Sequence, residues 1–398
     1  MAKRVAFRFA AIYFVLYFLP FPIDVLFESP GAPPWYARFW DVPVNALGRL
    51  LGIHVELRTV DGPDGLGHYV QLLCFALVAA VATGIWSALD RREPRDRLAH
   101  SLLCVWLRYV LAAWMLAFGF AKVIPSQMPL PDPSVLVLPY GESTPMKLLW
   151  TFMGTAPAYE QFAGFGELIG GLLLLARRTT ALGALLCAGV LANVVMMNVC
   201  YDVYVKVQAT HLLMLSLFLL LPSARRLVDA LVLGRAVPAL DLESRVPAPW
   251  RRPLLAAKVA FIGGILYSQA APAARHYAAV DGAPLPEPYG VYDVEEMRRD
   301  GELVAPLLTD ATYWHRVYFG RRGMGVVHAD GSQQTLALPG GSRGAWAWTG
   351  SVFTVGHEED GRLLVEGTLG GNKVAVRARP TDLKNLRLVQ RPFHWYFE

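Results

Sequence analysis

The chain has 398 residues, of which 54% are hydrophobic and only 17% charged, and its mean hydropathy is +0.35. Soluble domains carry about a quarter charged residues, so the composition excludes an ordinary soluble domain and indicates a multi-pass membrane protein. The net charge of +5 does not indicate nucleic-acid binding, because the Arg residues stand beside apolar runs, where they orient a membrane protein.

Seven apolar runs approach the roughly 20 residues that a membrane-spanning helix needs. They occupy residues 5–25, 69–89, 101–124, 160–176, 180–200, 207–222 and 253–271. The first run is rich in aromatic residues and lacks a small-residue cleavage site, so we expect a retained helix and not a signal peptide. The predicted fold class is a mainly α membrane protein with about seven transmembrane helices.

Basic clusters set the orientation of these helices. "MAKR", "DRREPRDR", "ARRTT" and the connection from "SARR" to "PWRR" all fall on one side if there are seven passes. That side is cytoplasmic by the positive-inside rule. We therefore expect a cytoplasmic N-terminus, an extracytoplasmic C-terminal region and, as partner, the lipid bilayer of a bacterial cytoplasmic (inner) membrane.

The pattern changes from about residue 288 onward. Short runs rich in β-branched and aromatic residues are separated by "ADGSQ", "EEDGR" and "LGGNK", which are hairpin signals. They predict a small antiparallel β domain that could meet an envelope protein partner. Its expected core aromatics are Trp314, Trp346, Trp348 and Phe353. In the outer loop 26–68, "GRLLGIHVELRTVDG" is a candidate short strand.

These patterns divide the chain into four parts. Residues 1–99 form an N-terminal two-helix segment with an outer loop, and residues 100–235 form a four-helix membrane core. Residues 236–274 hold a cytoplasmic connection and the last transmembrane helix, and residues 275–398 form the extracytoplasmic β domain.

Neither the cysteines nor the histidines show a metal-ligand spacing. Cys74, Cys104, Cys187 and Cys200 lie in or beside apolar runs without a CxxC pair, so we expect them to pack as small apolar side chains. The histidines of the β domain are spread over different elements, and they are His315, His328, His357 and His394. We therefore predict no metal site.

Polar residues gather at one predicted depth in the membrane. Lys122 lies near the outer end of the third helix, and Glu167 lies in the outer half of the fourth. The outer ends of the fifth and sixth helices add Asn198, Tyr201, Asp202, Lys206 and His211. Ionisable residues inside a membrane are costly and usually paired. Four helices that bring polar groups to one level predict a shared polar cavity.

The spacing of these residues predicts particular pairs. Asn198, Asp202 and Lys206 are four residues apart, so they share one face if a helix continues through them. We expect Lys206 to pair with Asp202 and Lys122 to pair with Glu167. The simpler interpretation is that both lysines and Asp202 mark the membrane boundary, with the lysine stems snorkelling. Glycines around Glu167 would let a helix or a flat ligand approach.

The candidate site residues fall into two groups. Those with a catalytic role are Glu167, Lys122, Asp202 and His211. Those that would bind a ligand are Tyr201, Asn198, Lys206, Arg108 and Glu142. Arg108 lies in the inner part of the third helix, where it either snorkels inward or pairs with the fifth helix near Asn193. Glu142, in the outer loop "YGESTPMK", is placed at the cavity rim.

Three stretches resemble the DoxX-like family of integral membrane proteins. They are "LRYVLAAWMLAFGFAKV", "FGELIGGLLLLARRTTALGALLCAGVLANVVMMN" and "HLLMLSLFLLLPSARRL", and the resemblance covers roughly residues 100–230. The matching positions are Arg108, Gly119, Lys122, Glu167, Gly170 and Gly171. The resemblance implies a four-helix core and a link to redox proteins, such as the small membrane subunit of a thiosulfate:quinone oxidoreductase. The flanking helices and the β domain are additions to that pattern.

Three functions remain open at this level. The first is a redox-linked role, in which a quinone or a thiol or sulfur compound meets the polar cluster, as in a quinone-linked oxidoreductase or a subunit of one. Against it, the sequence shows no haem, flavin or iron–sulfur motif, so electrons would need a partner protein or a freely diffusing quinone, which is the candidate cofactor. The second is a non-enzymatic scaffold or assembly factor that presents the β domain. The third is a small-molecule or lipid transporter, which lacks support from an inverted repeat.

Overall fold

The structure is a computed structural model that describes residues 2–23, 34–53, 55, 64–89, 93–238, 248–280, 282–321, 323–339, 345–348 and 351–390. The chain forms two compact units. The helical unit comprises Met1–Gln127 with Ala158–Ala278, and the sheet unit comprises Met128–Pro157 with Ala279–Glu398. Residues 128–157 thus group with the sheet, whereas the sequence analysis placed them in the four-helix core.

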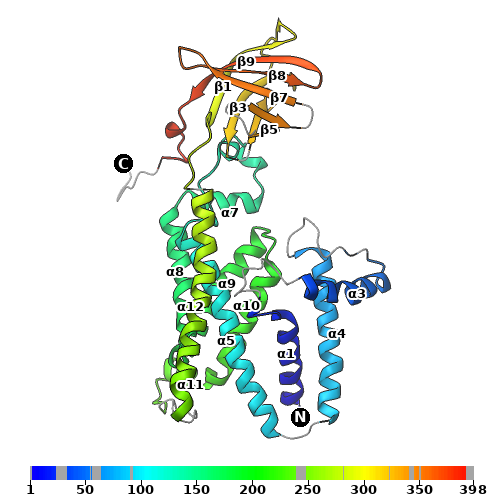
Figure 1. Ribbon diagram of the computed structural model, residues 1–398, viewed down its shortest axis with the longest axis vertical. Coiled ribbons are helices and arrows are strands. Elements are labelled where there is room, and N and C mark those ends of the chain that lie inside the picture. The colour runs from blue at the N-terminus through cyan, green and yellow to red at the C-terminus, as the bar shows by residue number, and fades with distance from the viewer. Residues whose placement is uncertain are drawn as a thin grey trace. The chain divides into compact units, whose positions relative to one another are not determined.

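The helical unit is built from long helices (Figure 1). Their bounds are α1 (Ala2–Phe18), α3 (Pro34–Leu50), α4 (Leu66–Leu89), α5 (Glu93–Val123), α8 (Pro157–Leu174), α9 (Thr180–Cys200), α10 (Lys206–Leu220), α11 (Ala224–Leu231) and α12 (Ala248–Ala279). α3 lies across α4 (Figure 1), where the sequence analysis expected only a loop with a short strand. Residues 48–50 of that candidate strand close α3, and residues 56–62 lie outside the described part of the chain.

Five segments of the described chain are long and apolar enough to cross a membrane, which indicates a membrane protein. They are Leu66–Leu89, Leu98–Val123, Arg177–Cys200, Lys206–Leu231 and Pro249–Ala279. The other two predicted spans correspond to α1 and α8, which have 17 and 18 residues. At about 1.5 Å per residue these helices are slightly short for a hydrocarbon core of about 30 Å. The seven-helix count stays a prediction.

α5 is the central helix of this unit. In the most apolar part of its candidate span 56% of the residues are buried, whereas the corresponding share is 11–33% in the other four candidate spans. Leu107, Leu111 and Met115 are fully buried, and they pack in one core with residues of α1, α9, α10 and α12. α5 therefore carries the apolar side chains that the other helices enclose, and it positions Lys122 at its end.

The described residues of the sheet unit form a curved antiparallel sheet of nine strands. The strands are β1 (Gly290–Arg299), β2 (Glu302–Leu303), β3 (Trp314–Gly320), β4 (Gly323–His328), β5 (Gln333–Pro339), β6 (Ala345–Trp348), β7 (Ser351–His357), β8 (Leu363–Leu369) and β9 (Asn372–Thr381). β1 pairs with both β3 and β9, so the sheet curls until its first and last long strands meet. The predicted antiparallel β domain is confirmed.

The predicted turns and core of this domain are also present. Gly331 and Gly361, with φ of +89° and +82°, close the β4–β5 and β7–β8 hairpins in the backbone region that favours glycine. Trp314 and Phe353 are 1% and 0% exposed in the core of the sheet. The side chains of Trp346 and Trp348 lie outside the described part of the structure, so their predicted role is untested.

The segment before α8 packs against the sheet. It carries α6 (Pro133–Leu136), a short 3-10 helix η2 (Tyr140–Glu142) and α7 (Pro145–Gly154). Asp132 accepts a hydrogen bond from the backbone N–H of Arg321 at 3.0 Å. Val137 packs against Val291, Tyr318 and Val327 on the sheet. These contacts explain why residues 128–157 belong to the sheet unit.

Candidate functional site

Lys122 and Glu167 form a buried ion pair between α5 and α8. The Nζ atom of Lys122 donates hydrogen bonds to both carboxylate oxygens of Glu167, at 2.9 and 2.7 Å. The two residues are 8% and 2% exposed. Each charged group therefore satisfies the other in a place where an unpaired charge would be costly. The predicted pairing of these two residues across neighbouring helices is confirmed.

Glycines let the two helices approach closely enough for this pair. A Cβ atom added to Gly164 would lie 2.7 Å from the Cβ of Lys122, and one added to Gly119 would lie 2.8 Å from the backbone nitrogen of Leu168. The glycines near Glu167 were predicted to admit another helix or a flat ligand. At Gly164 the neighbour is the backbone of α5.

The predicted common face of Asn198, Asp202 and Lys206 required a helix that continues through all three residues, and the turn between α9 and α10 interrupts it. α9 ends at Cys200 and α10 begins at Lys206, so no single helix runs through Asn198, Asp202 and Lys206. Asp202 has φ +52°, in the left-handed region that breaks a helix. The expected pair still forms, because Lys206 Nζ lies 2.7 Å from Asp202 Oδ1, but the Asp202 side chain is 81% exposed. This pair is a contact at the protein surface, and the boundary interpretation stays a prediction.

Asp64 is a partner of this turn that sequence reasoning missed. Its carboxylate accepts hydrogen bonds from the backbone N–H groups of Lys206 and Val207, at 2.7 and 3.0 Å. A carboxylate at the first turn of a helix satisfies unpaired N–H groups and complements the helix dipole. Asp64 therefore joins the segment before α4 to the start of α10. The signal lay in "DGPDG", which was assigned to an outer loop.

His211 lies among aromatic side chains of α1. Its Nε2 atom is 2.8 Å from the Tyr13 hydroxyl, and its Nδ1 atom is 2.7 Å from the carbonyl oxygen of Val207. When Nδ1–H donates to that carbonyl, Nε2 is unprotonated and accepts a hydrogen bond from the Tyr13 hydroxyl. The ring of Tyr17 stacks on the imidazole, with ring centroids 3.9 Å apart. Tyr13 and Tyr17 were missed, although their spacing of four places both on one helix face.

Asn198 and Tyr201 lie at the turn between α9 and α10. Asn198 is 5% exposed, and its amide lies 3.5 Å from the carbonyl oxygen of Val205. Its backbone carbonyl oxygen accepts a hydrogen bond from the backbone N–H of Val203 at 3.0 Å. Tyr201 follows the last residue of α9 and is 36% exposed. Asn198 thus holds the turn, which is a structural role.

Two predicted residues stand apart from these groups. Arg108 is 8% exposed, and its Nη1 atom lies 3.4 Å from the Thr180 hydroxyl at the start of α9. Thr180, and not Asn193, is the contact on α9. Glu142 is an exposed residue of η2 in the sheet unit. The contacts within the described residues therefore join the predicted cavity residues in separate pairs and small groups, and a single shared cavity remains a prediction.

A second buried cluster of charged residues was not predicted from the sequence. Arg8 of α1 is 2% exposed, and it donates to the carboxylate of Asp96 at 2.8 Å and to the carbonyl of Trp86 at 3.2 Å. Arg4 also donates to Asp96 at 2.7 Å. This cluster ties α1, α4 and α5 together. The signal was Arg8, which interrupts the first apolar run.

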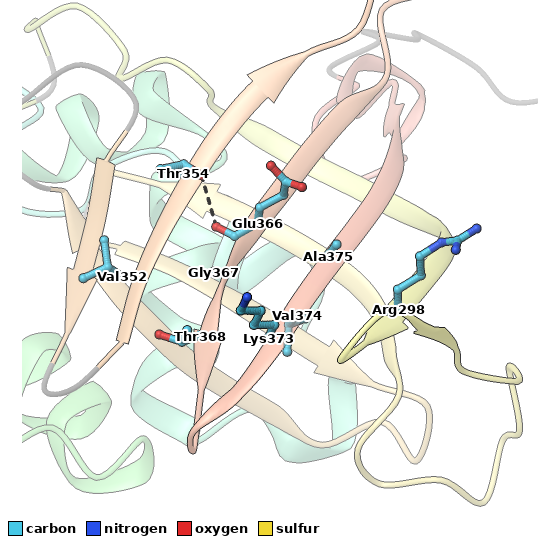
Figure 2. A pocket seen from close by; sticks show the side chains of 10 residues that line it. Arg298, Val352, Thr354, Glu366, Gly367, Thr368, Lys373, Val374 and Ala375 are labelled. Atoms are coloured by element: carbon cyan, nitrogen blue, oxygen red, sulfur yellow. Dashed lines mark hydrogen bonds between the residues drawn. The ribbon is translucent and has the colours of Figure 1, made fainter.

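The sheet carries a hollow that contains none of the predicted site residues. It has a volume of about 470 Å³ and spans β7, β8, β9 and the end of β1. Figure 2 shows Glu366 and Lys373 on neighbouring strands, with Arg298 across from them. The Thr354 hydroxyl donates to the carbonyl oxygen of Glu366 at 3.3 Å. Side chains of both charge signs line the hollow, so it shows no clear preference for an anion or a cation.

Metal ligands do not gather in the described residues, where no group of three or more His, Cys, Asp or Glu side chains could hold a metal ion. His328 is 9% exposed inside the sheet unit, whereas His394 lies outside the described residues. Cys187 packs against α8, since a Cβ atom added to Gly170 would lie 2.8 Å from its sulfur. The described cysteines are free thiols.

A comparison with known proteins finds a relative of part of the chain. The chain is 34% identical over 128 residues to the uncharacterized protein YwoB of Bacillus subtilis (strain 168), and this match covers 30% of the chain and 75% of YwoB. No family model matches the chain, and no solved structure matches it. The name of the relative assigns no activity.

Proposed function

The chain belongs to the same family as the uncharacterized protein YwoB of Bacillus subtilis, and from that premise we propose that it is a redox-linked membrane protein. In this proposal the helical unit is a DoxX-like bundle that binds a quinone. The chain crosses a bacterial inner membrane with its N-terminus in the cytoplasm. The observation that carries the proposal is the buried Lys122–Glu167 ion pair.

The pair has the chemistry that quinone reduction requires. A quinone takes up two electrons and two protons to become a quinol, and two thiols supply both when they form one disulfide. A carboxylate that accepts two hydrogen bonds from an ammonium, at 2.9 and 2.7 Å, can receive a proton from it and pass a proton on. In a low-dielectric site such a transfer also removes two charges that are costly to bury.

Tyr13 and His211 supply a second proton-carrying pair in the same helical unit. The Tyr13 hydroxyl is 2.8 Å from His211 Nε2, and it retains lone pairs that can accept a further hydrogen bond. The stacked ring of Tyr17 gives the neighbourhood the flat apolar surface that a quinone ring prefers. In the proposal this cluster binds the quinone and Glu167 handles protons.

A quinone extraction tests the proposal. The protein is purified in detergent and extracted with hexane, and the quinone per protein is measured by liquid chromatography. The proposal expects bound quinone in the wild type and a clear loss in Tyr17→Ala, which removes the stacked ring. Arg225→Gln is the control, because Arg225 is 97% exposed on its side chain. Equal trace amounts of quinone in all three proteins would contradict the proposal.

A non-enzymatic scaffold is the second candidate, and a specific observation favours it. Gly119 and Gly164 bring the backbones of α5 and α8 together around the ion pair, as in helix pairs that associate through small residues. In that function the pair fixes helix packing, and the sheet unit meets an envelope protein. The two functions differ in one outcome. A stable variant without the charges keeps the scaffold and loses quinone chemistry.

A further inference from the structure

Arg108 is a buried cation of α5 that pairs with no anion in the described part of the chain. It is 8% exposed, and its Nε atom is buried and makes no hydrogen bond within the described structure. Its Nη1 atom makes a long hydrogen bond of 3.4 Å to the Thr180 hydroxyl, and its guanidinium carbon lies 4.9 Å from the centre of the Tyr109 ring. Among the residues that the structure describes, no carboxylate pairs with it. An unpaired charge at this depth is costly.

The side chain of Arg108 is directed at the N-terminus of α9. Thr180 is the first residue of this helix of 21 residues, and the preceding N-cap residue, Thr179, makes no capping hydrogen bond. The Thr179 hydroxyl instead donates to the carbonyl oxygen of Leu173 at 2.6 Å. The first N–H groups of a helix carry a partial positive charge that favours anions. Two independent features of α5 and α9 thus call for a negative group at one place.

From these features we infer that Arg108 and the first turn of α9 bind a phosphate group. The Nε and Nη atoms along one edge of a guanidinium bind two oxygens of a phosphate side by side, and Nε is the atom that Arg108 leaves without a partner. The hydroxyl of Thr180 donates to the carbonyl of Ala176 at 3.1 Å, so its oxygen stays oriented toward Arg108. The phosphate belongs either to a lipid headgroup or to free phosphate.

The neighbouring sequence favours a membrane location for this phosphate. Arg177 and Arg178 are exposed directly before α9, where basic residues at a membrane surface attract anionic lipids. The site lies on α5 and α9 away from the contacts of Lys122 and Tyr13, and it is independent of any quinone chemistry. A bound phosphate would neutralise Arg108 and fix the start of α9 against α5.

Lipid binding to the detergent-purified full chain tests the inference, measured by native mass spectrometry. The probes are dioleoyl-phosphatidylglycerol and dioleoylglycerol, which carries the same acyl chains without a phosphate. We expect the wild type to bind the phospholipid at least tenfold more tightly than dioleoylglycerol. Arg108→Gln should abolish this preference, whereas Arg225→Gln, which removes an equal charge from an exposed residue, should keep it. A preference that survives in Arg108→Gln would overturn the inference.

Two further arms complete the experiment. Competition by millimolar inorganic phosphate would support the phosphate site and identify free phosphate as its source, whereas a lack of competition would support the site as one for a lipid headgroup. If Arg108→Gln does not fold, Arg108→Lys decides, because it keeps the charge and loses the two-nitrogen edge. Several-fold weaker phospholipid binding in Arg108→Lys supports the inference, and binding equal to that of the wild type overturns it.

Discussion

The ammonium of Lys122 lies 2.9 and 2.7 Å from the two carboxylate oxygens of Glu167, so one cation satisfies both oxygens of one anion. The two residues lie on different helices and are 45 positions apart in the chain. This contact joins α5, the central helix of the bundle, to α8. It is both a packing contact and a pair of groups able to exchange a proton, and mutations can separate these two roles.

Removal of one partner should destabilise the protein strongly. Lys122→Met or Glu167→Leu alone leaves a buried charge uncompensated, which costs about 3–5 kcal/mol. The double variant Lys122→Met/Glu167→Leu removes both charges and should regain most of the free energy of unfolding. Titration with sodium dodecyl sulfate in mixed micelles measures these values. If both single variants have the same free energy of unfolding as the wild type, the pair does not stabilise the bundle.

A methyl group at Gly164 should disturb the same helix contact. The added Cβ would lie 2.7 Å from the Cβ of Lys122 and 2.9 Å from the backbone nitrogen of Val123, so α5 and α8 must separate. Gly164→Ala should therefore lower the thermal midpoint. Gly189→Ala is the matched control, because a Cβ there meets nothing within 4 Å and Ala favours a helix by up to about 1 kcal/mol. Equal midpoints for the two variants would argue against close packing at Gly164.

The Tyr13 hydroxyl should contribute more to stability than the Tyr17 hydroxyl. Tyr13→Phe removes the donor that lies 2.8 Å from His211 Nε2, and the loss of such a hydrogen bond costs about 0.5–1.5 kcal/mol. Tyr17→Phe keeps the ring that stacks on His211 at 3.9 Å, so it should be nearly neutral. Thermal unfolding of both variants in detergent measures the difference. The opposite order would show that the Tyr13–His211 contact does not hold the cluster.

The sheet unit should lose stability in acid through Asp293. Partial burial alone would raise the pKa of Asp293, but hydrogen bonds from Arg316 and Thr381 and the charge of Arg316 outweigh it and hold the pKa below its usual value. This contribution is full above the unfolded-state pKa of about 3.9 and fades as the pH falls through the lower folded-state value.

Hydrogen exchange in the full chain tests this pH dependence. At neutral pH the amides of β1 and β9 should be better protected in the wild type than in Asp293→Asn, and the difference should shrink below about pH 4. Glu302→Gln on the exposed β2 controls for the loss of one negative charge. A difference that stays constant down to the lowest pH would contradict the assigned role of Asp293.

Strong local patterns made much of the architecture predictable. The turns around Gly331 and Gly361 were readable because Asp-Gly between alternating strands closes hairpins. The Lys122–Glu167 pair was readable because two opposite charges in adjacent apolar runs have few other ways to be satisfied. In both cases a short stretch of sequence is compatible with one structure of low free energy.

Contacts between distant segments could not be read in the same way. Asp64 caps α10 although it lies 142 positions before Lys206 in the chain. The sequence around Asp64 does not indicate this partner. The common face of Asn198, Asp202 and Lys206 was predicted only on the condition that a helix continues through Asp202, because a spacing of four is meaningful only if the backbone stays helical. α3 was assigned to a loop because its stretch of sequence is rich in Pro and Gly, and Pro43 does lie inside the helix.

Quinone reduction in proteoliposomes tests the central claim most directly. With decylubiquinone as acceptor and a dithiol as donor, one dithiol gives one disulfide and the quinone takes up two electrons and two protons. Liposomes without protein set the background rate. We predict that the wild type exceeds this background and that the folded double variant Lys122→Met/Glu167→Leu falls at least about 100-fold, the lower range for loss of a proton-transfer group. A double variant that reduces the quinone at the wild-type rate, or a wild type no faster than empty liposomes, would contradict the account.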